Sequence, residues 1–264
     1  MIVTIDTKKC RCKETKLCAS VCPYGFIWDL DENNYPRVKQ ALENYCIACG
    51  HCESICPTDA IKVGTLATPP FRYDKKIKIP AEHVELLLKT RRSVRTFKNT
   101  PLPRVELEDL LDIVRWIPTA SNKQQVKWMV IDSKEKVQQI SQLTIDFIKQ
   151  SNMAKEIVEY YELGDDIILR NAPHLIIALG EKEYFWGSAE AGIALTYLEL
   201  YAHAKGLGTC WAGFFTRAAT LYQPLIEYLD LPHNHSVCGA IMLGHPVFKL
   251  HSIPFRKELD VIWR

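Results

Sequence analysis

The sequence has no long hydrophobic run and no large excess of charge of one sign. No apolar stretch approaches the roughly 18 residues that a membrane-spanning helix needs, and the polar N-terminus MIVTIDTKKC has no apolar signal core. The formal net charge of the 264 residues is +2, which is too close to neutral to favour a nucleic-acid-binding protein. We therefore expect a cytoplasmic protein that binds neither nucleic acid nor membrane.

Several motifs of known chemistry are also absent from the sequence. No G-x-G-x-x-G follows an expected strand and no P-loop is present, so no dinucleotide-binding fold is indicated. The eight histidines are scattered without metal-ligand spacing, and His233 and His235 are expected in a solvated loop after Pro232. No paired carboxylates or Ser-His-Asp arrangement stands out, so we assign no residue as a general acid, base or nucleophile.

The composition is that of a folded protein with one large or two ordinary domains. Apolar residues make up 47% and charged residues 24%, so the chain can bury a core. We expect a small cysteine-rich domain at 1–66, an extended linker with prolines at 67–80, and a domain at 81–264 that alternates helix and strand patterns. In the larger domain the patterns predict a helix over 105–117, buried strands at 128–131, 175–179 and 237–243, and a long helix over 187–205 that ends before Gly206.

Eight of the ten cysteines are crowded between Cys10 and Cys56. This crowding argues against a disulfide framework and favours metal ligands. The second group reads Cys46-Ile-Ala-Cys49-Gly-His-Cys52-Glu-Ser-Ile-Cys56-Pro57, which is the C-x2-C-x2-C-x3-C-P run of bacterial ferredoxins. The remaining cysteines, Cys210 and Cys238, lie among apolar neighbours and are expected to pack in the core as small hydrophobic residues.

The first cysteine run departs from this pattern at its front. It ends as expected in Cys18-x3-Cys22-Pro23 but begins C-x-C-x5-C, two residues longer overall, and residues 1–66 as a whole resemble two-cluster ferredoxins. By the crossed ligation of those ferredoxins, one [4Fe-4S] cluster takes Cys22, Cys46, Cys49 and Cys52, and the other takes Cys10, Cys12, Cys18 and Cys56. A degenerate first site that holds a three-iron cluster or none is the alternative.

A run of arginines follows a helix that is expected to end near Leu88. Arg91, Arg92, Ser93 and Arg95 place three guanidinium groups and a hydroxyl within five residues, which suits a phosphate group. Basic runs are more often solvated surface, so this run by itself is a weak indication. Three further segments follow in the chain: PTASNKQQ at 118–125, GLGTCWAGF at 206–214, and LGHP at 243–246 before a basic tail.

In order and spacing these segments resemble the nitroreductase family of FMN enzymes over residues 82–262. The resemblance implies an α+β protein in which a ferredoxin-like domain precedes a three-layer α/β/α FMN domain. It implies that the FMN phosphate and ribityl chain are bound by Arg91, Arg92, Ser93, Arg95 and Arg256. It also implies that the isoalloxazine ring is lined by Pro118, Thr119, Ala120, Asn122 and Gln124, with backbone groups of Ala212 and Gly213 near its N5. The plainer readings are that Gly208 is only a helix C-cap and that Arg256 is only a surface charge.

The two halves together predict an iron–sulfur flavoprotein oxidoreductase. Two [4Fe-4S] clusters would pass electrons to FMN and on to an electron-poor organic acceptor of the nitroaromatic or quinone type. The resemblance further implies a homodimer, a small-molecule electron acceptor, and either a ferredoxin-type donor or NAD(P)H. The alternatives are an electron-transfer module or redox sensor without its own substrate, or a relative that dehalogenates its substrate or fragments flavin.

Overall fold

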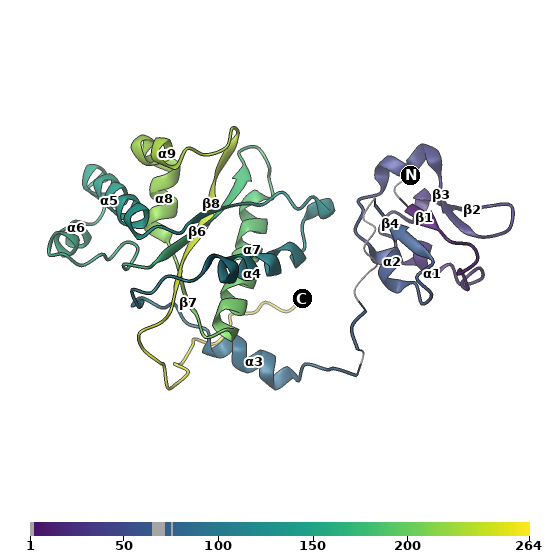
Figure 1. The fold of residues 1–264 in the computed structure, drawn as a ribbon, viewed down its shortest axis with the longest axis horizontal. Coiled ribbons are helices and arrows are strands. Elements are labelled where there is room, and N and C mark those ends of the chain that lie inside the picture. Colours follow the sequence, from purple (N-terminus) through teal and green to yellow (C-terminus); the bar gives the residue numbers. More distant parts are fainter. Residues whose placement is uncertain (1–2, 65–71, 75) are drawn as a thin grey trace. The chain divides into compact units, whose positions relative to one another are not determined.

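The computed structural model describes residues 3–64, 72–74 and 76–264, which form two compact units. Unit 1 comprises the described residues up to Lys78 together with Thr119–Lys123, and unit 2 comprises Ile79–Pro118 and Gln124–Arg264 (Figure 1). Of the expected linker, residues 67–71 and 75 lie outside the described residues. No helix in the described part of the chain combines the length and apolar character that crossing a bilayer requires.

Unit 1 consists of short strands, turns and small helices. β1 (Val3–Ile5) pairs with β4 (Ile61–Val63), and β2 (Trp28–Leu30) pairs with β3 (Pro36–Val38), both antiparallel. The helical segments are α1 (Leu17–Ser20), η1 (Gly25–Ile27), η2 (Gln40–Tyr45) and α2 (His51–Ile55), and η4 (Ala120–Asn122) also belongs to this unit. The amide N–H of Asp6 donates to the carbonyl of Ala60 at 2.7 Å, so the pairing of β1 with β4 brings the first cysteine run beside the end of the second.

Unit 2 is built on a four-stranded antiparallel sheet in the order β5-β6-β8-β7. The strands are β5 (Lys127–Ile131), β6 (His174–Glu181), β7 (Gly208–Trp211) and β8 (His235–Gly244). The helices are α3 (Ala81–Thr90), α4 (Arg104–Asp112), η3 (Ile113–Trp116), α5 (Lys134–Ser151), α6 (Lys155–Glu162), α7 (Gly187–Ala204), α8 (Gly213–Leu221) and α9 (Gln223–Leu229). The helix expected over 105–117 is confirmed as α4 followed by η3, and the three expected strands are β5, β6 and β8.

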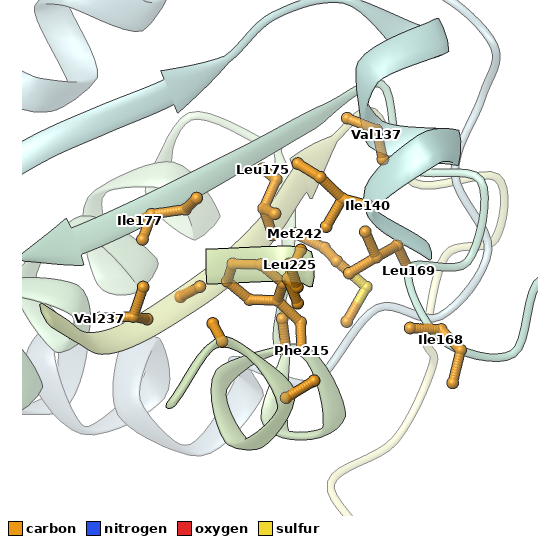
Figure 2. Packing of buried hydrophobic residues seen from close by; sticks show 14 of the residues in the cluster. Val137, Ile140, Ile168, Leu169, Leu175, Ile177, Phe215, Leu225, Val237 and Met242 are labelled. Atoms are coloured by element: carbon orange, nitrogen blue, oxygen red, sulfur yellow. The ribbon is translucent and has the colours of Figure 1, made fainter. Parts of the chain in front are cut away.

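The sheet is buried on both faces, which makes the three layers that the sequence predicted. Along β6, Leu175 and Ile177 face one hydrophobic cluster and Ile176 faces the other, because successive side chains of a strand point to opposite faces. Figure 2 shows the first cluster, in which Phe215 of α8 and Leu225 of α9 pack against the strands. The second cluster joins the opposite face to α4, η3 and α7, and both central strands therefore read as continuous apolar runs.

The end of α7 corrects one interpretation of the sequence. Gly206 has a φ of 76°, and the N–H of Leu207 donates to the carbonyl of Ala202 at 2.8 Å, which is a Schellman ending. Gly206, not Gly208, therefore terminates the helix, and Gly208 is the first residue of β7. The expectation of a solvated loop is confirmed for His233, which is exposed in a turn, but it is wrong for His235. The side chain of His235 is buried at the start of β8, and its Nδ1 lies 2.8 Å from the carbonyl oxygen of His233.

Candidate cofactor sites

The eight clustered cysteines divide into two groups of four, and each group lines its own cavity in unit 1. The first cavity is lined by Cys10, Cys12, Cys18 and Cys56, and the second by Cys22, Cys46, Cys49 and Cys52. This division is the one that crossed ligation requires. The longer loop at the front of the first run therefore still brings three thiols together with Cys56.

The number of thiols around each cavity matches the four ligands of a [4Fe-4S] cluster. Among the described residues, no three His, Cys, Asp or Glu side chains close around one point as the ligands of a single metal ion would. A four-iron cubane is wider than an ion, and its thiolate ligands stand correspondingly further apart. Four thiols around each cavity thus fit a [4Fe-4S] cluster.

The two most buried of the expected ligand thiols have raised pKa values when no metal is bound. Burial raises the pKa of Cys18 to about 11 and that of Cys52 to about 12. Cys56 differs, because the effect of burial on its pKa is outweighed by N–H donors that include Ala60, whose nitrogen lies 3.2 Å from Sγ, and the net shift is downward. Iron must therefore displace the protons of Cys18 and Cys52 when it binds, so cluster binding in each cavity is coupled to the release of thiol protons.

In unit 2 the arginine run is an extended segment held against the edge of the sheet. The N–H of Val94 donates to the carbonyl of Thr209 at 2.8 Å, and the N–H of Lys98 donates to the carbonyl of His245 at 2.8 Å. Gly208 allows Val94 to lie this close to β7, because a Cβ at position 208 would lie 2.7 Å from Cγ2 of Val94. With Val94 turned to the sheet, Arg95 is exposed beside it.

The arginines gather into one positively charged group, which includes a residue far along the chain. The pKa of Arg92 is lowered by desolvation and then by the positive charges of Arg256, Arg91 and Arg95. Arg256 lies in the C-terminal segment after β8, which has no regular secondary structure. Among the described residues, no carboxylate lies within 4 Å of Arg92, Arg95 or Arg256, so the group has excess positive charge that an anion such as a phosphate can neutralise.

Arg91 differs from the other three arginines because it faces a buried acid that the sequence analysis missed. Glu199 of α7 is 4% exposed and lies 3.5 Å from the Arg91 guanidinium. Its carboxylate also accepts hydrogen bonds from Thr209 Oγ1 at 3.0 Å and from Trp211 Nε1 at 2.8 Å. One turn further along α7, His203 Nε2 lies 3.0 Å from Thr90 Oγ1. The face of α7 thus holds the start of the arginine run in place.

The start of α8 offers one free backbone donor where two were expected. The N–H of Ala212 donates to the carbonyl of Ala240 at 2.9 Å, and the carbonyl of Ala212 accepts from Thr216. Gly213 is the first residue of α8, and its N–H has no acceptor among the described residues. A Cβ at Gly213 would meet no atom within 4 Å, so the space beside this donor is open. Of the pair, Gly213 is therefore the residue that can donate to a bound group.

The segment expected to line the flavin ring is divided between the two units. Thr119, Ala120 and Asn122 belong to unit 1, and Pro118 and Gln124 belong to unit 2. Within unit 1, Nδ2 of Asn122 donates to the carbonyl oxygens of Ile47 and Ala48, each at 3.2 Å. Asn122 and Gln124, together with Ser121, have left-handed backbone conformations with φ of 51–53°. Such conformations in residues other than glycine cost free energy and are concentrated at functional sites.

The two cysteines outside unit 1 occupy the core, as the sequence predicted. Cys210 is buried in the first cluster, and Cys238 packs against the second. Burial raises the pKa of both thiols, although the charge of Arg95 and the hydroxyl of Ser93 act in the opposite direction on Cys210.

Comparison with known proteins gives a separate match for each part of the chain. The Nitroreductase family matches residues 88–245, and the 4Fe-4S binding domain family matches residues 42–62. An FMN reductase [NAD(P)H] of Bacillus subtilis is 29% identical over 167 residues, which are 59% of this chain and 62% of that protein. A ferredoxin of Methanothermococcus thermolithotrophicus is 39% identical over 61 residues, which are 23% of this chain and 95% of that protein.

A solved structure shares the fold of the larger unit. The FMN-bound nitroreductase of Desulfitobacterium hafniense superposes with a TM-score of 0.58 at 18% identity, covering 70% of this chain and 100% of that structure. The chain thus covers the whole length of this structural neighbour, but less than two thirds of the Bacillus subtilis protein.

Proposed function

Because the chain belongs to the nitroreductase family and carries a ferredoxin-like domain in front, we propose that it passes electrons from two [4Fe-4S] clusters to FMN and on to an electron-poor organic acceptor. It is an FMN-dependent oxidoreductase with an iron–sulfur domain. When bound, the clusters transfer single electrons and FMN couples these to two-electron chemistry. Nitroaromatic or quinone compounds are the proposed acceptors.

The division of eight thiols between two cavities is the observation that carries this proposal. A single cluster would need only four of these cysteines, whereas each cavity has four of its own. The arginine group supports the FMN part of the proposal. Its positive charges, from Arg91, Arg92, Arg95 and Arg256, are suited to a terminal phosphate. Gly213, with Pro118, Thr119, Ala120, Asn122 and Gln124, is proposed to border the isoalloxazine ring.

The deciding experiment replaces one cluster ligand and follows both cofactors. Cys49→Ser should break the cluster of the second cavity and leave FMN bound, because Cys49 is no part of the arginine group. In anaerobic stopped-flow measurements, reduction of FMN by a low-potential one-electron donor should then be lost. FMN reduction by NAD(P)H is the comparison arm, because NAD(P)H appears in the name of the Bacillus subtilis relative.

A variant without its cluster that still reduced FMN from the one-electron donor at the wild-type rate would remove the clusters from the path. The unit would then have a structural or regulatory role, and the protein would be an ordinary flavin reductase. Turnover of nitroaromatic and quinone compounds by the wild-type protein tests the acceptor. Failure with every acceptor would favour an electron-transfer module or a sensor.

We also propose that the protein is a homodimer. Apolar side chains are exposed on α3, on α7 and along the C-terminal segment, and a surface this apolar usually marks an interface. They include Val84, Leu86, Leu88, Ile193, Tyr197, Phe248, Leu250, Phe255, Leu259, Ile262 and Trp263. Light scattering should give twice the mass of the 30.3 kDa chain, and truncation after Pro246 should shift the protein towards monomer.

A further inference from the structure

The N-terminal unit distributes its charges unevenly around the two cysteine cavities. Residues 1–66 contain eight lysines and arginines and eight acidic residues, so this part of the sequence has no excess of either sign. Five of the eight cations nonetheless lie within residues 8–16, where Glu14 is the one acid. We call these cations the basic loop: Lys8, Lys9, Arg11, Lys13 and Lys16.

The basic loop encloses two of the thiols of the first cavity and is open to solvent. All five side chains are exposed, and Arg11 itself lines the cavity beside Cys10 and Cys12. Within the described part of the chain, the one ion pair of the loop joins Lys9 to Asp6 at 3.8 Å. Lys13 donates to the carbonyl oxygen of Asn33 at 3.2 Å and lies 3.8 Å over the Tyr35 ring, and no carboxylate among the described residues neutralises its charge.

The second cavity has different surroundings. The described residues that line it include no lysine or arginine, and Tyr24 at its wall begins an aromatic group. The ring of Phe26 lies edge-on to those of Tyr24 and Tyr45, at 5.9 and 5.4 Å between centroids, and Phe26 and Tyr45 are exposed. The two cavities therefore present one basic surface and one aromatic surface.

The extra length of the first cysteine run supplies part of this charge. Lys13 and Lys16 both lie in the five-residue stretch between Cys12 and Cys18, where the regular ferredoxin run has two residues. An oxidised cubane in the first cavity would add about −2, and the five cations with Glu14 and the paired Asp6 would still leave about +1. The surface thus stays positive with the cluster bound.

We propose that the basic loop docks an acidic one-electron carrier protein of the ferredoxin type, and that electrons enter through the cluster of the first cavity. This inference rests on the proposed function, because it requires a cluster at that cavity. In each transfer one electron leaves the reduced carrier, which becomes oxidised, and reduces the cluster, and no bond forms or breaks. Opposite charges speed the encounter and orient the partner, and salt screens both effects.

The test compares two double variants with the same change in charge. Lys13→Glu with Lys16→Glu alters the basic loop, and Lys39→Glu with Lys62→Glu is the control, because neither control residue lines a cysteine cavity. The probe is an acidic bacterial two-cluster ferredoxin. Its affinity in the oxidised form is measured by calorimetry, and its rate of electron donation in the reduced form is measured by anaerobic stopped flow.

At low salt the loop variant should bind the ferredoxin with an affinity lower by roughly tenfold or more, and its rate of electron uptake should fall by the same factor. The affinity and the rate of the control variant should stay within about threefold of wild type. The wild-type rate should fall as salt rises, and that of the loop variant should depend on salt much less. A photogenerated neutral deazaflavin radical should reduce both variants at the wild-type rate, because it carries no charge to steer. Iron content verifies that each variant is loaded, and Lys8→Glu with Lys13→Glu replaces the first pair if that pair fails to fold.

Three results would overturn the inference: equal effects of the loop and control variants, a wild-type rate that does not fall with salt, or equal slowing with the ferredoxin and with the neutral radical. The last result would mean that the cations act on the cluster and not on docking. Reduction of the clusters by the ferredoxin without reduction of FMN would instead refute the proposed function, and the loop-dependent affinity would still support docking.

Discussion

Replacing Arg91 by alanine should produce two separable losses, one of FMN affinity and one of stability. The first arises because a guanidinium contact to a phosphate is a charge-assisted hydrogen bond, worth about 1.5–3 kcal/mol, or roughly 10–150-fold in affinity. The second arises because Glu199, which is 4% exposed, loses the cation that lies 3.5 Å from its carboxylate.

The loss of stability should be smaller than that of a fully broken buried ion pair. Glu199 keeps its hydrogen bonds from Thr209 at 3.0 Å and from Trp211 at 2.8 Å, so its carboxylate is not left without partners. The side chain of Arg91 is also 28% exposed, which lets water screen the pair. We therefore expect the free energy of unfolding of the FMN-free protein to fall by about 1–2 kcal/mol.

The two losses can be separated with a second substitution. Glu199→Gln removes the unpaired charge, so in the Arg91→Ala background it should restore much of the stability while FMN affinity stays low. Arg95→Ala is the matched control, because no carboxylate of the described residues lies within 4 Å of Arg95, and this variant should lose affinity alone. Flavin fluorescence quenching measures the affinity, and urea unfolding of FMN-free protein measures the stability. If Arg91→Ala retained FMN as tightly as wild type, the phosphate assignment would be mistaken, and if Glu199→Gln gave no recovery, the pairing argument would fail.

Three further predictions follow from other parts of the structure. Protein prepared without oxygen should contain eight irons and eight sulfides per chain, because each cavity has four thiols; four irons would mean that the first cavity holds no cubane. Gly208→Ala should weaken FMN binding by roughly tenfold, because its Cβ would displace Val94, and Val94→Ala should restore the binding. Burial lowers the pKa of His174, whose Nε2 accepts the N–H of Leu102 at 2.7 Å, below its ordinary value of 6.5. The contribution of neutral His174 to stability is therefore present above pH 6.5 and is lost as the pH falls through the lowered pKa. Urea unfolding should show lower stability at about pH 5.5 than at about pH 7.5. The His174→Gln variant should show less of this loss.

The periodic parts of the sequence predicted their structure well, because local pattern decides them. The run from Val237 to Leu243 is apolar at almost every position, and such a run suits a strand covered on both faces, as β8 is. The cysteine spacing was equally informative, because ligand geometry leaves few ways to place four thiols around one cluster. By contrast, β7 was not predicted as a strand, because its four residues are too few to show a period.

The contacts that position the arginine group could not be read from the sequence. Glu199 lies 108 positions from Arg91 in helix α7, and no periodicity connects the two. His235 was expected in solvent because Pro232 and Asn234 mark a turn, yet β8 begins directly after that turn and buries the ring. In both places tertiary packing brings together groups that local preference treats separately.

The four arginines of the proposed phosphate-binding group differ in how firmly the protein positions them and in how much net charge they contribute. Glu199 and His203 lie one turn apart on α7, and they hold the Thr90–Arg91 end of the run through side-chain contacts. An arginine fixed before its ligand arrives loses less conformational entropy on binding, although its acid partner cancels part of its charge. Arg92, Arg95 and Arg256 have no such partner among the described residues, and their mutual repulsion favours an anion between them. Arg91 therefore contributes mainly position and the other three contribute mainly charge, so raising salt should weaken the effect of Arg95→Ala on FMN affinity more than the effect of Arg91→Ala.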